Sequence, residues 1–184
     1  MQSYKTLNKQ VFKSGVFSIV PIRFEDRIDI MNWRNEQIYH LRQKEILKRE
    51  DQDLYFNNVI KKLFKDEKPD QILFSFLKDN ICIGYGGLVH VNWNDKNAEI
   101  SFVMKTELEE INFSEYWMKF LNLLEKVAFQ EIKLHKIYVY SFNLRPNLYD
   151  VLKNIGYNEE ARLKEHYYHN NKYIDVLINS KIIK

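Results

Sequence analysis

The chain has 184 residues, of which 45% are hydrophobic and 15% are aromatic, so it is long and apolar enough for one well-packed domain and is not intrinsically disordered. Its 28 basic and 25 acidic residues are interspersed and give a net charge of +3, which argues against a nucleic-acid-binding protein. No apolar run reaches the roughly eighteen residues of a membrane span, and the polar N-terminus has no signal peptide, so we expect a cytoplasmic protein without membrane partners.

The first half of the chain predicts a strand, two helices and three strands. Residues 1–16 are polar and read as a loosely attached lead-in to a single domain that spans residues 17–184. Apolar periodicity then predicts the following elements: a strand at 17–22, a helix opened by Glu25 and Asp26, a helix at 53–65, and strands at 71–78, 81–91 and 98–104. Asp79 and Asn80 tolerate positive φ, so they predict a two-residue hairpin turn.

The second half alternates strands and helices before a final hairpin. We expect a long helix at 113–129, a strand at 136–142, a helix at 146–155 and strands at 160–169 and 172–179. Pro146 suits the first turn of the short helix and Gly156 suits its C-cap. Consecutive hairpins followed by a strand–helix–strand unit predict a mixed α/β (α+β) fold with helices on both faces of the sheet.

Several short blocks along the chain match one family in order and spacing. They are IGYGGL at 83–88, AEISF at 98–102, LHKI at 134–137, LKNIGY at 152–157 and EARLKEH at 160–166. Together they resemble the N-acetyltransferases of the GNAT superfamily, in particular the branch that contains ribosomal-protein N-terminal and amino-sugar acetyltransferases. The resemblance implies a mostly antiparallel, seven-strand-type sheet that splays between its fourth strand (98–104) and its fifth strand (136–142). It also implies an enzyme that uses acetyl-CoA as the acyl donor.

The resemblance also implies which residues contact acetyl-CoA. Backbone amides at Val103, Met104 and Lys105 would face the acyl donor, and Asn143, just after the fifth strand, would contact its arm. Members of the family usually bind the pyrophosphate with a glycine-rich loop before the long helix. Here Asn112, Glu115 and Trp117 occupy the positions of Arg or Gln, Gly and Gly, and further glutamates precede them at 107, 109 and 110. Three alternatives stay open: the loop is in another register, CoA binds weakly, or the site has changed its use.

Acetyl transfer to an amine needs a base, an oxyanion donor and an acid for the leaving thiolate. Glu99 lies in an otherwise apolar strand, where burial would raise its pKa and make it a usable base. It could equally face outward or have a structural hydrogen bond. Tyr149 is the candidate acid by resemblance, although it could be an ordinary core or surface aromatic residue, and Tyr140 is a weaker candidate.

Four residues are candidates for binding the acceptor. Trp33 and Arg34 form part of a Trp-Arg-Asn segment that resembles the family's substrate-cleft helix, although Trp33 could also belong to the core. Arg34 could pair with a carboxylate or phosphate of the acceptor. His90 and Trp93 lie at the far end of the central strand. No histidines or carboxylates have metal-ligand spacing and the single Cys82 has apolar neighbours, so we expect neither a metal site nor a disulfide.

The leading functional hypothesis is an acetyl-CoA-dependent N-acetyltransferase that acts on the primary amine of a small polar acceptor. Aromatic residues and scattered basic residues favour a nucleotide-linked amino sugar as this acceptor. A protein N-terminus is an alternative acceptor, and a degenerate GNAT-fold binding module is an alternative function. A homodimer is compatible with the sequence, and no nucleic-acid or membrane partner is expected.

Overall fold

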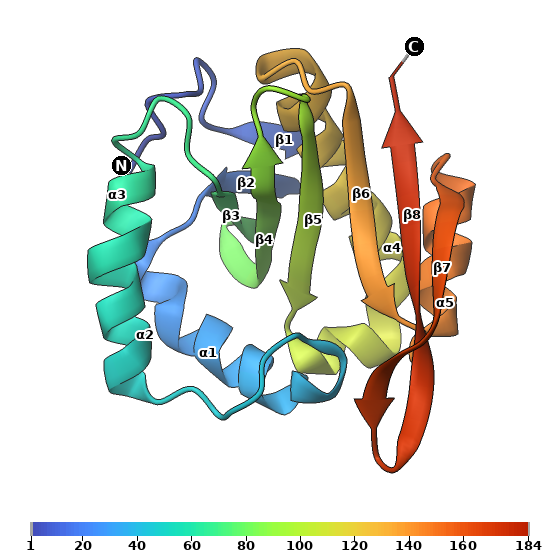
Figure 1. Ribbon diagram of the computed structural model, residues 1–184. Helices are drawn as coiled ribbons and strands as arrows, with labels where there is room; N and C mark the ends of the chain where they lie inside the picture. The colour runs from blue at the N-terminus through green and yellow to red at the C-terminus, as the bar shows by residue number, and fades with distance from the viewer. Residues whose placement is uncertain (1, 184) are drawn as a thin grey trace.

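A twisted mixed sheet forms the centre of the molecule in the computed structural model, which describes residues 2–183 (Figure 1). Within these residues the sheet has eight strands in the order β1-β2-β3-β4-β5-β6-β8-β7. In chain order the strands are β1 (Phe12–Ser14), β2 (Phe17–Pro21), β3 (Ile72–Lys78), β4 (Ile81–Asn92), β5 (Asn97–Met104), β6 (Lys136–Phe142), β7 (Asn158–His169) and β8 (Lys172–Ile182). All neighbouring strands are antiparallel except β5 and β6, which are parallel. The predicted mixed, mostly antiparallel sheet is therefore confirmed, with one strand more than expected.

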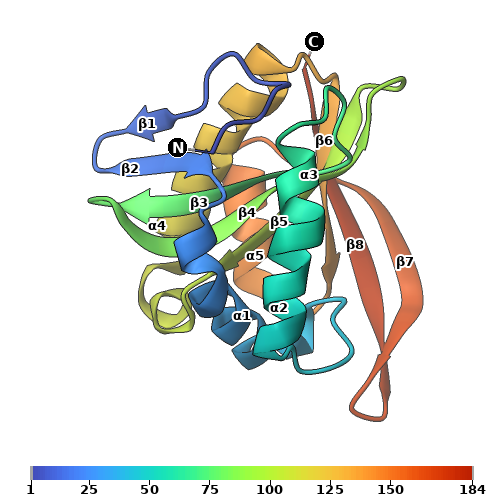
Figure 2. The same ribbon diagram turned by 90° about the vertical axis from the view of Figure 1, so that its left-hand side faces the viewer.

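Helices cover both faces of this sheet (Figures 1 and 2). On one face lie α1 (Arg27–Glu36) and a long helix built from α2 (Arg49–Tyr55), a π-helical turn (Phe56–Ile60) and α3 (Lys61–Leu63). On the other face lie α4 (Thr106–Glu125), which continues as a π-helical segment (Lys126–Glu131), and α5 (Pro146–Asn154). In the described part of the chain, no helix combines the length and the apolar character needed to cross a membrane.

Both predicted hairpins are present with the expected backbone geometry. Asp79 and Asn80 have φ values of 50° and 67° between β3 and β4. Asn170 and Asn171 have φ values of 46° and 60° between β7 and β8. Short polar side chains tolerate this left-handed region, so the two turns set the pairing next to each turn. The register then shifts between Phe76 and Leu77 in the first hairpin and at two places in the second. The β7–β8 hairpin extends away from the body of the molecule (Figure 2).

The sheet opens between its only parallel neighbours in the described chain, β5 and β6. Their register covers three pairs, Asn97 with Lys136, Ala98 with Ile137 and Glu99 with Tyr138. Beyond Glu99 the two strands separate, and α4 packs behind the gap (Figure 1). The predicted splay at the carboxyl ends of these strands is confirmed.

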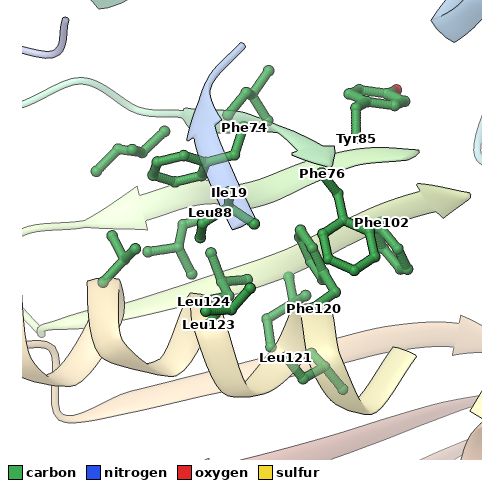
Figure 3. Packing of buried hydrophobic residues seen from close by; sticks show 14 of the residues in the cluster. Ile19, Phe74, Phe76, Tyr85, Leu88, Phe102, Phe120, Leu121, Leu123 and Leu124 are labelled. Atoms are coloured by element: carbon green, nitrogen blue, oxygen red, sulfur yellow. The ribbon is translucent and has the colours of Figure 1, made fainter. Parts of the chain in front are cut away.

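Aromatic packing between the sheet and α4 forms the centre of the core (Figure 3). Phe102 of β5 stacks on Phe120 of α4, with ring centroids 3.9 Å apart and an interplanar angle of 9°. Phe76 of β3 packs edge-on against both rings. Tyr85 lies on the opposite face of β4, because side chains alternate along a strand. One face of the sheet therefore holds the core under α4, and the other face is available to line a site beneath α1 and α2.

The N-terminal lead-in is not loosely attached, so this expectation is wrong for residues 2–16. Phe12 forms part of β1, and Tyr4, Leu7 and Phe12 are buried. The Tyr4 hydroxyl donates to the Leu73 carbonyl and accepts from the Leu73 N–H, both at 2.8 Å. Polar residues separate these three apolar side chains, so the sequence showed neither the alternation of a strand nor the spacing of a helix in this region.

Two helices begin earlier than their sequence patterns predicted. The helix expected at 53–65 starts at Arg49, and Leu54, which was expected on its apolar side, is 58% exposed. The helix expected to begin at 113 starts at Thr106 and has a break at Asn112, where φ is −124° and ψ is 19°. The region expected to be a phosphate-binding loop is therefore mostly helical.

Candidate active site

A cleft of about 260 Å³ lies where β5 and β6 separate. Its walls come from the middle of β5, the second half of β6, the end of β4, α1 and the segment after it, Gln71 before β3, α4, and the start of α5. The charged residues that line it are Arg34, Arg42, Glu99 and Arg145. Glu99 is the last residue of β5 that pairs with β6, so its side chain lies at the point where the gap begins.

Glu99 is 5% exposed and lines this cleft, so it does not face outward, but it does have a structural partner, as the other alternative proposed. Arg42, from the segment after α1, pairs with its carboxylate and also lies over the Tyr140 ring, 4.8 Å from the centroid. Burial raises the pKa of the Glu99 carboxyl, while Arg42 and His90 oppose this rise. The site thus holds a buried carboxyl group whose pKa is set by burial and by its neighbours.

A second cavity of about 290 Å³ adjoins the cleft under α1 and α2. Arg34, Gln71, Val89 and Ser101 line both cavities, so the two are adjacent. The remaining walls of the second cavity are mainly aliphatic and aromatic: Ile22, Ile30, Leu47, Tyr55, Phe56, Leu73 and Tyr85, with Asp51 and Gln52 as polar members. The second cavity can therefore take an apolar or ring-shaped body beside a fixed cation.

The candidate acceptor residue Arg34 is placed at the junction of the two cavities. Its Nη1 donates to the Tyr85 hydroxyl at 2.6 Å, and its Nε donates to the Gln43 Oε1 at 3.0 Å. These two bonds fix the guanidinium plane. His90 also lines the cleft, at an irregularity in the β4–β5 register between Val89 and Asn92, and has a φ of 51°.

The three predicted backbone contacts at the end of β5 differ in their availability. The Lys105 N–H donates to the Ile83 carbonyl of β4 at 2.9 Å, so it is already paired. Val103 is in register with Tyr85, and its N–H points to the same side as that of Lys105. The Met104 N–H points to the other side, toward the gap, where the Met104 carbonyl accepts from Gln37 Nε2 at 2.7 Å. Of these three amides, only that of Met104 is directed into the gap.

Four other candidates lie outside the cavities. Trp33 is 7% exposed and belongs to the core, and the Trp93 Nε1 donates to the Pro69 carbonyl at 2.9 Å. The Tyr149 hydroxyl donates to the Phe142 carbonyl at 3.2 Å, whereas Tyr140, the weaker candidate, does line the cleft. Asn143 is exposed, and its backbone N–H donates to the Asp175 carbonyl at 2.9 Å.

The sequence reasoning missed Arg42 and Arg145. Arg42 lies in an irregular segment, and Arg145 immediately precedes α5, so neither has a periodic pattern that marks it as inward-facing. The one local sign was Pro146: the residue before a proline is disfavoured in helical conformation, so Arg145 was expected to lie outside α5. Their positions depend on the packing of segments distant in sequence.

A family model described as an acetyltransferase (GNAT) domain matches residues 19–178. The chain belongs to this acetyltransferase family. The predicted superfamily and enzyme class are therefore confirmed. GNAT acetyltransferases use acetyl-CoA as the acyl donor, so the predicted donor is confirmed as well.

Solved structures with the same fold include spermidine N-acetyltransferases from Vibrio cholerae. The complex with CoA and spermine has a TM-score of 0.80 and 19% identity, with coverage of 92% of this chain and 96% of that chain. A dodecameric structure in an intermediate state has a TM-score of 0.75 and 20% identity, with coverage of 92% and 95%. A search by sequence among curated proteins returns no match. The comparisons support the GNAT fold and not the finer branch suggested by the sequence blocks.

Proposed function

We propose that this GNAT acetyltransferase transfers the acetyl group of acetyl-CoA to the primary amine of a small acceptor that also carries a negative charge. The observation that carries this proposal is the cleft itself, which places one buried carboxyl group, Glu99, at the opening between β5 and β6 among three arginines. A nucleotide-linked amino sugar has the required groups: an amine, a ring body and phosphates.

The charges of the cleft favour an anionic acceptor over a polyamine. Arg34, Arg42 and Arg145 line the cleft, and Glu99 is the one carboxylate among the described residues that line it. Asp51 is the corresponding carboxylate of the second cavity. A polyamine carries several positive charges and needs several carboxylates, whereas Arg34 offers a fixed donor pair to a phosphate or carboxylate. The apolar second cavity would hold the ring beside that anionic group.

Two residues of the cleft, Glu99 and Tyr140, and the backbone amide of Met104 farther along β5 can supply the steps of acetyl transfer. Glu99 would accept a proton from the acceptor amine, directly or through one water molecule, so that the nitrogen attacks the thioester carbonyl. The Met104 N–H, directed into the gap, would donate to the developing oxyanion. Tyr140 would then donate its hydroxyl proton to the leaving thiolate, a role that its position in the cleft supports better than that of Tyr149.

Thermal unfolding with and without acetyl-CoA, followed by an amine screen, tests the proposed function. Acetyl-CoA at one hundred times its Kd should add about 2.7 kcal/mol to the free energy of unfolding. Acetylated products should then form from amines with a phosphate or carboxylate in preference to spermidine. No stabilisation at millimolar acetyl-CoA would instead support a degenerate binding module, and a preference for spermidine would refute the anionic acceptor.

Arg42 should set the pH range in which Glu99 works. Replacement of Arg42 by Gln removes the nearest charge that opposes the burial of Glu99, so the pKa of the Glu99 carboxyl should rise. A base is active above its pKa, so the acid limb of log(kcat/KM) against pH should move to higher pH. Lys44→Gln is the matched control, because Lys44 is an exposed cation of the same segment. Equal profiles for the two variants would show that Arg42 does not act on the base.

A further inference from the structure

A buried polar cluster closes the end of the cleft where α4 and α5 begin. The Arg145 Nη1 donates to the Glu109 Oε1 at 2.9 Å, which joins the first turns of α4 to the residue before α5. The guanidinium lies over the rings of Phe113 and Trp117, at 5.6 Å and 5.5 Å from their centroids. Arg145 and Trp117 both line the cleft. Arg145 contributes to the positive charge of the cleft, but the proposed steps of acetyl transfer use no residue of this cluster.

Trp117 has a hydrogen-bond donor without a partner. The residue is 2% exposed, and its Nε1 has no acceptor among the described residues. An unmet buried donor costs on the order of 1–3 kcal/mol, so such groups are uncommon unless something else satisfies them. Trp117 also occupies a position where the family pattern has a glycine whose backbone approaches the pyrophosphate of CoA. Because Trp117 lines the cleft, a ligand bound there is a source of the oxygen that this buried donor lacks.

The charge of Arg145 is balanced by the Glu109 carboxylate, which at this position would repel the phosphates of CoA. The side chains of Arg145 and Glu109 are 14% and 12% exposed. Burial raises the pKa of the Glu109 carboxyl, and the neighbouring Arg145 opposes this effect. Burial and the charge of Arg145 lower the pKa of nearby His40 to about 3, so His40 is neutral near pH 7. Arg145 is thus a buried cation that is neutralised by Glu109, a residue in the first turns of α4.

We propose that the Trp117 Nε1–H and the Arg145 guanidinium bind acyl-CoA at this end of the cleft, in place of the glycine amides that the chain lacks. Trp117 would donate to an oxygen of the CoA arm, and Arg145 would pair with a phosphate. In the free protein Glu109 holds Arg145 in position, and the phosphate displaces this carboxylate when acyl-CoA binds. This inference rests on the proposed function, because it assigns residues of this chain to the donor of that reaction.

Replacement of Trp117 by Phe tests the indole donor. The variant keeps an aromatic ring and loses the N–H, so the affinity for acetyl-CoA, measured by isothermal titration calorimetry, should fall roughly 3- to 10-fold. Trp93→Phe is the matched control, because the Trp93 N–H has a backbone partner and lies outside the cleft. Trp93→Phe should leave the affinity unchanged. Trp117→Phe should also lose less thermal stability than Trp93→Phe, although Trp117 is the more buried ring.

Replacement of Glu109 by Gln tests whether the Glu109 carboxylate competes with the CoA phosphate for Arg145. With Arg145 released, acetyl-CoA should bind roughly 3- to 10-fold more tightly, whereas Glu110→Gln, an exposed change in the same turn, should have a smaller effect. The double variant Glu109→Gln/Arg145→Gln leaves no unpaired buried charge and should bind more weakly than Glu109→Gln.

Three results would overturn the proposal. Unchanged affinity in Trp117→Phe would show that the indole donor does not contact acyl-CoA. Weaker binding in Glu109→Gln would show that the ion pair supports the site rather than competing for it. In both cases the wild-type protein still binds acetyl-CoA and the proposed function stands, whereas a wild-type protein that does not bind acetyl-CoA would refute the proposed function as well.

Discussion

Replacement of Glu99 by Gln should lower the rate of acetyl transfer roughly 10²- to 10⁴-fold, the usual contribution of a general base. The amide is nearly the same shape as the carboxyl group, so the fold and the affinity for acetyl-CoA should be kept. The loss would then reflect proton transfer rather than packing. Because the base must be deprotonated, the wild-type log rate should rise with pH up to the pKa of Glu99 or of the acceptor amine, whichever is higher.

Steady-state kinetics with an acceptor from the amine screen would measure this effect. Arg42 pairs with Glu99, so the Gln variant also weakens this contact, and the unfolding midpoint of both proteins should be compared first. Glu67→Gln, a change of an exposed carboxylate outside both cavities, is the control for loss of charge alone. A Glu99→Gln enzyme with the wild-type rate would mean that water removes the proton from an amine that is already neutral.

Replacement of Gly87 by Ala should lower the free energy of unfolding by about 3 kcal/mol, because β3 and β4 approach too closely to admit a side chain. A Cβ at Gly87 would lie 2.0 Å from the Ile72 carbonyl oxygen and 2.9 Å from the Leu73 Cα. These are backbone atoms, so the strands themselves would have to move. The same part of β4 carries Tyr85 and Val89, which line the second cavity, so activity should fall together with stability.

Urea unfolding of a series of alanine variants would measure this clash. At Gly84 the nearest atom to an added Cβ is 3.0 Å away, so Gly84→Ala should cost only about 1 kcal/mol. The midpoint should therefore fall further for Gly87→Ala than for Gly84→Ala, with similar m-values. If the two variants are equally stable, the close approach of β3 and β4 at Gly87 is not what requires glycine.

The sequence predicted those parts of the fold that depend on local chemistry. Asp79-Asn80 and Asn170-Asn171 identified both hairpins, because two adjacent residues that tolerate positive φ leave few other conformations. The family blocks predicted the gap between β5 and β6. The start of α4 was missed because residues 106–112 were aligned with a loop, and Asn112 does interrupt the helix.

The candidate site was predicted only where it lies on regular elements. Glu99 and Arg34 occupy a strand and a helix, where alternation or spacing limits the direction of a side chain. Arg42 and Arg145 approach the cleft from irregular segments, and their partners are 57 and 36 residues away in sequence. Trp33 and Trp93 were misplaced because an aromatic residue suits a core and a cleft equally well.

The short contact between β5 and β6 also has a consequence for the way the chain folds. On one side of this seam, β1 to β5 are joined by antiparallel pairing, and on the other side β6, β7 and β8 form a second antiparallel group. The two groups share three residue pairs, and α4 with its π-helical continuation separates them in sequence. Parallel pairing across such a crossover stabilises the chain little until the long connection is ordered, because closing that connection costs conformational entropy. The opening in which we propose that the two substrates meet is therefore also the junction that we expect to form late in folding.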